Sequence, residues 1–170
     1  MAKEYLKEFI SEELIELLQY RIQMERASAY LYEAMSHYLA NRSLSGAAAL
    51  WDKFAKEEVI HADKAEEFLM SFNIVPQMRQ LDAQPYEFEG LGDIIMRTFE
   101  HEQEVSRQCI TLAKAALQES NLMVYGLGQF YVNEQVEELS KCYQLIDLLE
   151  QYGESAPGLG LLDKALKKLV

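Results

Sequence analysis

The sequence predicts an all-α protein, a bundle of four long helices followed by a short fifth helix. Apolar residues recur at alternating steps of three and four through four long segments, which is the spacing of a helical stripe that faces a core. The three prolines, Pro76, Pro85 and Pro157, lie outside these segments. No strand-like alternation of apolar and polar residues competes with the helical pattern.

The four long helices are predicted to form two hairpins. In chain order they are expected over about residues 11–40, 45–72, 91–119 and 122–152. Ser45 is placed to cap the second helix, because a serine oxygen can accept a hydrogen bond from a free backbone N–H group of the first turn. Short connections join the first helix to the second and the third to the fourth, so each pair should be antiparallel.

The connection between the second and third helices decides the topology. It covers residues 73–90 and is long enough to run the length of the bundle, so the two helices that it joins should be parallel. A final helix, expected over about residues 161–169, is too short to persist alone and must pack on something. The bundle is expected to occupy about residues 11–152 of one domain spanning residues 1–170.

Composition limits the possible partners and the compartment. There are 28 acidic and 16 basic side chains, and the net charge of -12 argues against nucleic acid or an anionic membrane as a partner. The charge suits a protein that attracts cations, although solubility alone would also explain it. Cys109 and Cys142 are too few for a disulfide framework. With no long apolar stretch, and charges interrupting residues 1–8, we expect a soluble cytoplasmic protein.

Each helical stripe is interrupted near its middle by side chains that bind metals. These are Glu25 on the first helix, Glu58 and His61 on the second, Glu102 on the third, and Gln135 and Glu138 on the fourth. Four buried carboxylates without partners would cost several kcal/mol each. Only Arg21, one turn from Glu25 and off the stripe, is near enough in sequence to be a cationic partner. Two divalent cations would balance the four charges, and oxygen-rich ligation suits iron or manganese.

The spacing of these residues repeats within the chain. One common offset along the sequence maps Glu25 onto Glu102, Glu58 onto Gln135 and His61 onto Glu138. Such a repeat predicts two half-sites related by a pseudo-two-fold axis. The alternative is a bundle whose stripes carry scattered polar residues, and this alternative gives no reason for a common offset.

With these residues in this order, the chain resembles the ferritin family, and specifically the non-haem ferritins of bacteria. The shared pattern is one Glu on the first and third helices, Glu-x-x-His on the second, and a comparable pair on the fourth. Local sequences at residues 46–49, 57–61, 101–103 and 131–135 also match. The similarity runs from about Glu12 to the C-terminus. It implies the ferritin-like bundle with one long crossover.

The resemblance implies a ferroxidase centre that binds two iron ions. The residues that it assigns to this centre are Glu25, Tyr32, Glu58, His61, Glu102, Gln135 and Glu138. Glu25, Glu58 and His61 would hold the first iron. The second would share Glu58 as a bridge and be held by Glu102 with one of the two fourth-helix residues. Tyr32 matches the family's site tyrosine, an electron donor and hydrogen-bond partner, although it could be an ordinary core residue.

A third iron site is expected beside the pair. Glu57 and Glu134 are related by the same offset as the two half-sites, Glu137 lies one turn from Glu134, and Glu138 can reach from the core side. These carboxylates would repel one another unless solvated or bridged by a cation. A solvated acidic surface is the alternative, but bacterial non-haem ferritins have a third site at matching positions. There it would hand iron on towards the shell interior.

Four further residues refine the expected haem content, iron entry and surface. Val59 stands where a bacterioferritin has its haem-binding methionine, so no haem is expected. Tyr125 and Gly128 match positions that are acidic in the three-fold channels of animal heavy-chain ferritins. Because neither side chain attracts a cation, we expect another route, through the wall of the bundle, to contribute to iron entry. His101 points about 100° away from the stripe and is expected at the surface.

The resemblance therefore implies iron storage and detoxification. Fe(II) would be oxidised by dioxygen or hydrogen peroxide at the di-iron site and kept as an Fe(III) mineral inside a homo-oligomer, a 24-subunit shell. One alternative is a related peroxide-consuming enzyme that stores little iron. Another is a structural bundle that binds metal only for stability. Neither nucleic acid nor a membrane is expected as a partner.

Overall fold

The computed structural model describes residues 9–170, and within that range the chain forms helices and no strands. The helices are α2 (Glu12–Asn41), α3 (Ser45–Ser71), α4 (Leu91–Gln118), α5 (Leu122–Tyr152) and α6 (Ala156–Leu166), followed by a 3-10 turn, η1 (Lys167–Leu169). This confirms the predicted all-α fold class. The expectation drawn from the charges among residues 1–8 concerns residues outside the described range.

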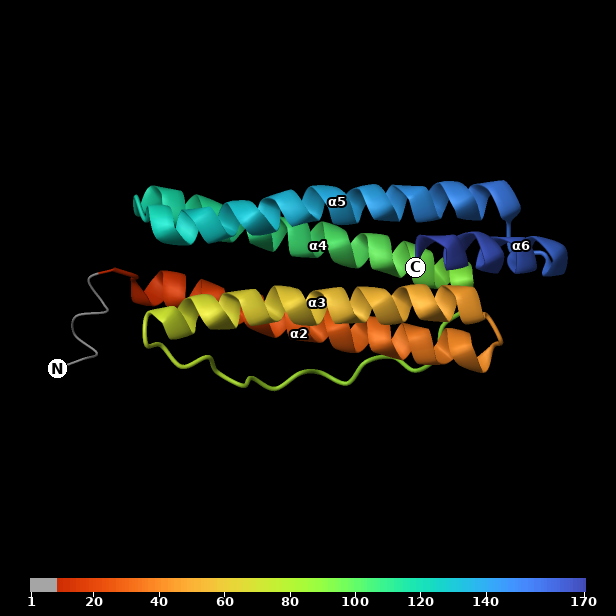
Figure 1. Ribbon diagram of the computed structural model, residues 1–170, viewed down its shortest axis with the longest axis horizontal. Helices are drawn as coiled ribbons and strands as arrows, with labels where there is room; N and C mark the ends of the chain where they lie inside the picture. Colours follow the sequence, from red (N-terminus) through yellow and green to blue (C-terminus); the bar gives the residue numbers. More distant parts are fainter. Residues whose placement is uncertain (1–8) are drawn as a thin grey trace.

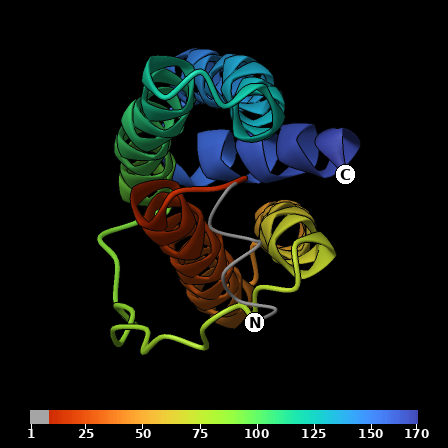
Figure 2. The ribbon, with the colours of Figure 1, turned by 90° about the vertical axis from the view of Figure 1, so that its left-hand side faces the viewer.

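The four long helices form two antiparallel pairs that lie one above the other (Figure 1). One pair is α2 with α3, and the other is α4 with α5. Residues 72–90 run along the outside of the α2–α3 pair from one end of the bundle to the other. Because of this long crossover, α3 and α4 run in the same direction, as the loop lengths predicted. The view along the bundle shows the two pairs and the crossover separately (Figure 2).

The first turn of α3 corrects one prediction. Ser45 is the first helical residue and not the cap; Leu44 precedes the helix and makes no side-chain hydrogen bond there. A carboxylate from α6 takes over this role, because the backbone N–H of Ala47 donates to Asp163 at 2.8 Å. The contact is close: a Cβ atom on Gly46 would lie 2.1 Å from the carbonyl oxygen of Asp163. Glycine at position 46 therefore allows α6 to reach the end of α3.

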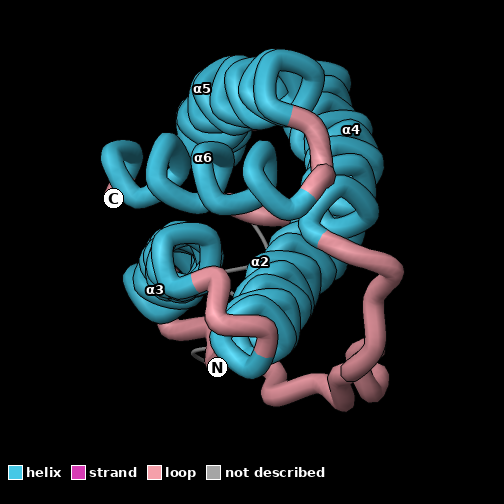
Figure 3. The backbone as a smooth tube through the Cα atoms, turned by 90° about the vertical axis from the view of Figure 1, so that its right-hand side faces the viewer, coloured by secondary structure: helices cyan, strands magenta, loops and turns pink. Residues whose placement is uncertain are grey.

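The C-terminal helix begins earlier than predicted. It was expected over residues 161–169, but α6 starts at Ala156 and includes Pro157 in its first turn. Proline is tolerated there because its missing N–H would have no partner in the helix. Leu162 and Leu166 are fully buried. The helix lies across the end of the bundle between α3 and α5, so it has the packing partner that its short length requires (Figure 3).

Two apolar clusters fill the two ends of the bundle. The cluster near α6 includes Met35, Leu39, Trp51, Ile94 and Leu162, and the cluster at the other end includes Leu14, Leu18, Ala65, Leu112 and Val124. Burying side chains of this kind supplies most of the favourable free energy of folding. None of the described helices is long and apolar enough to cross a membrane. The middle of the bundle is left for buried polar side chains.

Candidate metal centre

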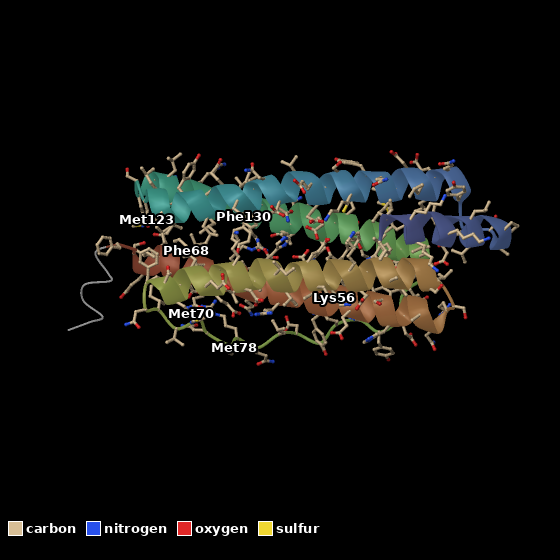
Figure 4. All side chains as sticks on the ribbon, in the orientation of Figure 1. Lys56, Phe68, Met70, Met78, Met123 and Phe130 are labelled. Atoms are coloured by element: carbon tan, nitrogen blue, oxygen red, sulfur yellow. The ribbon has the colours of Figure 1, made fainter. Side chains whose placement is uncertain are left out.

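Polar side chains are buried between the two apolar clusters. Oxygen and nitrogen atoms gather there between the helix pairs (Figure 4). The buried residues include all six predicted ligands of the di-iron pair, namely Glu25, Glu58, His61, Glu102, Gln135 and Glu138. Each of the four long helices contributes at least one of them. The tertiary structure therefore brings the residues of the predicted site into one region of the core.

The first half-site has the geometry of a metal-binding group. Glu25, Glu58 and His61 each offer one ligand atom, and these atoms all lie within 4.8 Å of one another. Glu58 and His61 share one face of α3 because they are three residues apart. The Nδ1 atom of His61 is 3.2 Å from Glu58 Oε2. The Tyr131 hydroxyl donates to the backbone carbonyl of His61 at 2.8 Å and ties α5 to this part of α3.

The second half-site is organised around Glu102. The Tyr32 hydroxyl donates to one oxygen of this carboxylate. The Gln135 amide donates to the other oxygen at 3.2 Å. Ser106, one turn after Glu102, donates to the Oε1 atom of Gln135 at 2.7 Å and so orients the amide. Both oxygens of Glu102 thus have donors from other helices, and Tyr32 is in direct contact with the carboxylate cluster.

Glu138 and the residues expected at the third site lie at the edge of the cluster. Glu138 contacts Lys141 at 2.9 Å, and the same ammonium group contacts Glu57 at 3.0 Å. Glu134 Oε2 lies 3.5 Å from His61 Nε2. Glu137 is exposed. The four acidic residues named for this site are therefore not equivalent: two share an ammonium group, one faces a core histidine and one faces solvent.

Burial makes the carboxylates hard to ionise together. Loss of hydration raises the pKa of Glu25 to about 8, with a further rise from Glu58 and an opposing effect of Arg21. Loss of hydration and the charge of Glu102 raise the pKa of Glu58 to about 8. Burial also raises the pKa of Glu102 to about 7, although the Tyr32 hydrogen bond opposes this shift. A divalent cation would relieve the repulsion, so the site is suited to metal binding.

The position of Arg21 corrects another prediction. It was expected off the helical stripe, but only 2% of its side chain is exposed. Its Nε atom lies 2.9 Å from Glu25 Oε1, and its Nη1 atom donates to the sulfur of Cys109 at 3.1 Å. The spacing of four residues between Arg21 and Glu25 was the available signal, because such residues are neighbours on a helix. What the sequence did not reveal is that α4 covers the guanidinium group.

His101 is also placed differently from the prediction. It was expected at the surface, but it is half-buried. Its Nε2 atom lies 2.7 Å from the Ser28 hydroxyl, and its ring meets the Tyr32 ring edge-on with centroids 5.8 Å apart. Burial lowers the pKa of His101 to about 4. The reason is that α4 packs against α2, so the face of α4 that carries His101 contacts α2 residues such as Ser28 and Tyr32.

Gly128 is a packing residue of α5. It is buried, and a Cβ atom added to it would come within 3.0 Å of the Cα atom of Ala113. The residue therefore lets α5 approach α4 closely inside the subunit. Gly128 thus has a packing role within the subunit, and entry of iron by another route stays a prediction. Tyr125, the other position named, is half-buried against the apolar cluster.

Comparison with known proteins places this arrangement in a family. A family model described as a ferritin-like domain matches residues 15–152. The bacterial non-heme ferritin of Escherichia coli O6:H1 is 30% identical over 160 residues, which cover 94% of this chain and 97% of that protein. The chain belongs to the ferritin family. The bacterial non-heme ferritin of Campylobacter jejuni is 31% identical over 160 residues, with coverages of 94% and 96%.

Solved structures of other members agree with this assignment. An open pore ferritin from the archaeon Archaeoglobus fulgidus has a TM-score of 0.90 and 30% sequence identity, and the match covers 98% of each chain. An engineered closed form of the same archaeal ferritin has a TM-score of 0.88 and 32% identity, covering 93% of this chain and 96% of that one. Family membership, together with the metal-binding geometry of Glu25, Glu58 and His61, supports iron storage as the general role.

Proposed function

We propose that this chain oxidises Fe(II) at a di-iron site inside each subunit and stores the Fe(III) as a mineral within a 24-subunit shell. The observation that carries the proposal is the buried group of Glu25, Glu58 and His61, whose ligand atoms lie within 4.8 Å of one another. Next to it are two more buried carboxylates, Glu102 and Glu138. Such a group is costly without cations and is charge-balanced by two divalent ions.

Each ligand has a role in this proposal. Glu25, Glu58 and His61 bind the first iron, and Glu58 bridges to the second. Glu102 binds the second iron together with Gln135 or Glu138. The hydrogen bonds in the structure favour an orienting role for Gln135, because its amide donates to Glu102 and its carbonyl oxygen accepts from Ser106. In that case Glu138 is the direct ligand.

The oxidation takes one electron from each iron. Two Fe(II) ions and one dioxygen molecule, with two protons, give two Fe(III) ions and one hydrogen peroxide molecule. If hydrogen peroxide is the oxidant, it takes the same two electrons and two protons and gives two water molecules. The two irons supply both electrons in each case, and Tyr32, whose hydroxyl donates to Glu102, is the proposed hydrogen-bond partner beside the pair. The protein contributes the geometry and the charge balance.

We also propose a third iron site at the edge of the pair, with Glu57, Glu134, Glu137 and Glu138 as ligands. Glu57 and Glu138 already share one cationic group, the ammonium of Lys141. Iron bound here would be on its way from the pair towards the shell interior. Cytoplasmic location completes the proposal and is supported by the two buried free thiols, Cys109 and Cys142, which suit a reducing compartment.

Replacement of Glu58 by alanine tests the proposed function. We expect near-complete loss of rapid Fe(II) oxidation in stopped-flow absorbance, because the oxygen ligand shared by both irons is lost. The shell should still assemble, since the emptied position carries less buried charge. The matched control is Glu150→Ala, which removes a carboxylate from an exposed position on α5 and should oxidise iron at the wild-type rate.

Two measurements on the wild-type protein separate the possible functions. Oxygen or peroxide consumption on addition of Fe(II) distinguishes a redox site from a bundle that binds metal only for stability. Size-exclusion chromatography of iron-loaded protein then distinguishes a mineral-filled shell from an enzyme that stores little iron. A wild-type oxidation rate in Glu58→Ala would remove the basis of the site assignment.

A further inference from the structure

Lys141 places a cationic group at the border between the proposed di-iron pair and the proposed third site. It lies on α5, three residues after Glu138, and the prediction that only Arg21 could be a cationic partner of the buried carboxylates is therefore wrong. Its Nζ atom is 2.9 Å from Glu138 Oε1 and 3.0 Å from Glu57 Oε2. Glu57 belongs to α3, so the ammonium joins the two helix pairs as well as two carboxylates. These distances are those of charge-assisted hydrogen bonds.

The two carboxylates need a cation between them. Glu138 is buried, and 29% of the Glu57 side chain is exposed. With no cation between them, two carboxylates that approach one atom to about 3 Å would repel each other, and burial would strengthen the repulsion. The same oxygen atoms can face either an ammonium group or a metal ion. Lys141 and a third iron are therefore alternatives for the same position.

The internal repeat contains two equivalent lysine positions, and the bridge between two carboxylates is described at one of them, Lys141. The common offset that relates the two half-sites also maps Lys64 onto Lys141 and Glu57 onto Glu134. The Nζ atom of Lys64 lies 4.0 Å from the centre of the Phe130 ring. Lys64 thus makes a cation–π contact where Lys141 bridges two carboxylates. The bridge is a specific feature of the third-site edge and not a consequence of the repeat.

We propose that Lys141 is a tethered cation that competes with iron for the third site. While that site holds no metal, the ammonium group neutralises Glu57 and Glu138; when iron binds there, the ammonium group moves aside. The side chain has room to move, because 37% of it is exposed and its stem is flexible. The inference rests on the proposed third site and predicts that this site fills after the pair and binds iron more weakly.

Anaerobic Fe(II) binding to the intact shell tests this role. We would measure it by calorimetry and by iron-edge anomalous diffraction for wild type, Lys141→Gln and Lys141→Arg. The wild-type protein should bind two irons tightly per subunit and a third weakly. In Lys141→Gln the third iron should bind roughly tenfold more tightly or better, because the competing charge-assisted hydrogen bonds are lost. Lys141→Arg keeps the charge and should behave like wild type.

A second lysine provides the matched control. Lys56 is on the exposed face of α3 and contacts Asp52 at 2.6 Å (Figure 4). Lys56→Gln removes the same charge from a surface ion pair and should leave all three affinities unchanged. Shell size on size-exclusion chromatography shows whether each variant assembles.

The outcomes separate this inference from the proposed function. Equal third-site affinity in wild type and Lys141→Gln overturns the role of Lys141. So does the absence of metal near Glu57 in both proteins while the pair is filled. If no metal binds at Glu25, Glu58 and His61 in either protein, the di-iron proposal itself fails.

Discussion

The metal-free protein should lose stability as the pH rises from about 4.5 to about 8. Glu25, Glu58 and Glu102 all have pKa values raised by burial above the value of 4.5 for an exposed glutamate. Between pH 4.5 and the raised value, the folded state therefore holds more protons than the unfolded state. The free energy of unfolding is fully preserved below about pH 4.5 and falls as the pH rises through the folded-state pKa values.

The smallest of the three shifts sets a lower bound for the effect. Burial raises the pKa of Glu102 from 4.5 to about 7. At about 1.4 kcal/mol per pKa unit, this group alone accounts for roughly 3 kcal/mol. The shifts of Glu25 and Glu58 are larger, but the three carboxyl groups interact electrostatically with one another, so their effects do not add independently. For a chain of this length, about 3 kcal/mol corresponds to a fall of roughly 6–12 °C in the unfolding midpoint.

Thermal unfolding of the metal-free protein across this pH range measures the effect. Glu58→Gln removes one of the repelling charges and should flatten the dependence on pH. Glu150→Gln removes the same charge from an exposed position and should keep the wild-type slope, which controls for the net charge of -12. Added divalent metal should stabilise the wild-type protein most at the alkaline end. A midpoint that does not fall with pH, or an equal slope in Glu58→Gln and wild type, would refute the reasoning.

Three further predictions concern the surroundings of the site. Arg21→Met should destabilise the metal-free protein by roughly 3–5 kcal/mol in urea unfolding above about pH 8, where Glu25 is ionised, because it breaks a buried ion pair with Glu25; a loss below about 1 kcal/mol at that pH would argue against this pair. Protein purified from its native source should show no stoichiometric haem absorption band, because Val59 cannot bind haem iron. Tyr125→Trp, which adds bulk without charge, should leave the Fe(II) oxidation rate of the intact shell within about twofold of wild type, since Tyr125 carries no charge that would draw iron past it. A strong fall in that rate would mean that iron enters past Tyr125. Gly128 is unsuitable for this test because a side chain there would collide with Ala113.

The sequence by itself determined the helices, their order and the crossover. The predicted and observed boundaries of the four long helices agree within one residue, because helix formation depends on local periodicity and on end signals. Ser11, at the predicted start of the first helix, accepts a hydrogen bond from the N–H of Leu14 as its cap. The length of residues 73–90 was enough to predict that α3 and α4 are parallel.

The candidate ligands could also be found from the sequence, because each interrupts an apolar stripe. A residue whose neighbours are all apolar on one helix face must enter the core with them, whatever its own polarity. This reasoning correctly predicted which polar residues are buried, namely Glu25, Glu58, His61, Glu102 and Glu138. It also predicted that the two hairpins would carry matching half-sites, because one common offset relates their ligands.

Only the tertiary structure decided how the residues beside the stripes are paired. The cap of α3 comes from Asp163, which is 116 residues from Ala47 in the sequence. Lys141 reaches Glu57 across 84 residues. Arg21 is buried because α4 covers it, with Cys109 as a contact 88 residues away. A helical stripe predicts which side chains enter the core, but the contacts of residues at its edges depend on the distance and rotation of the neighbouring helices. These are set only when the helices pack.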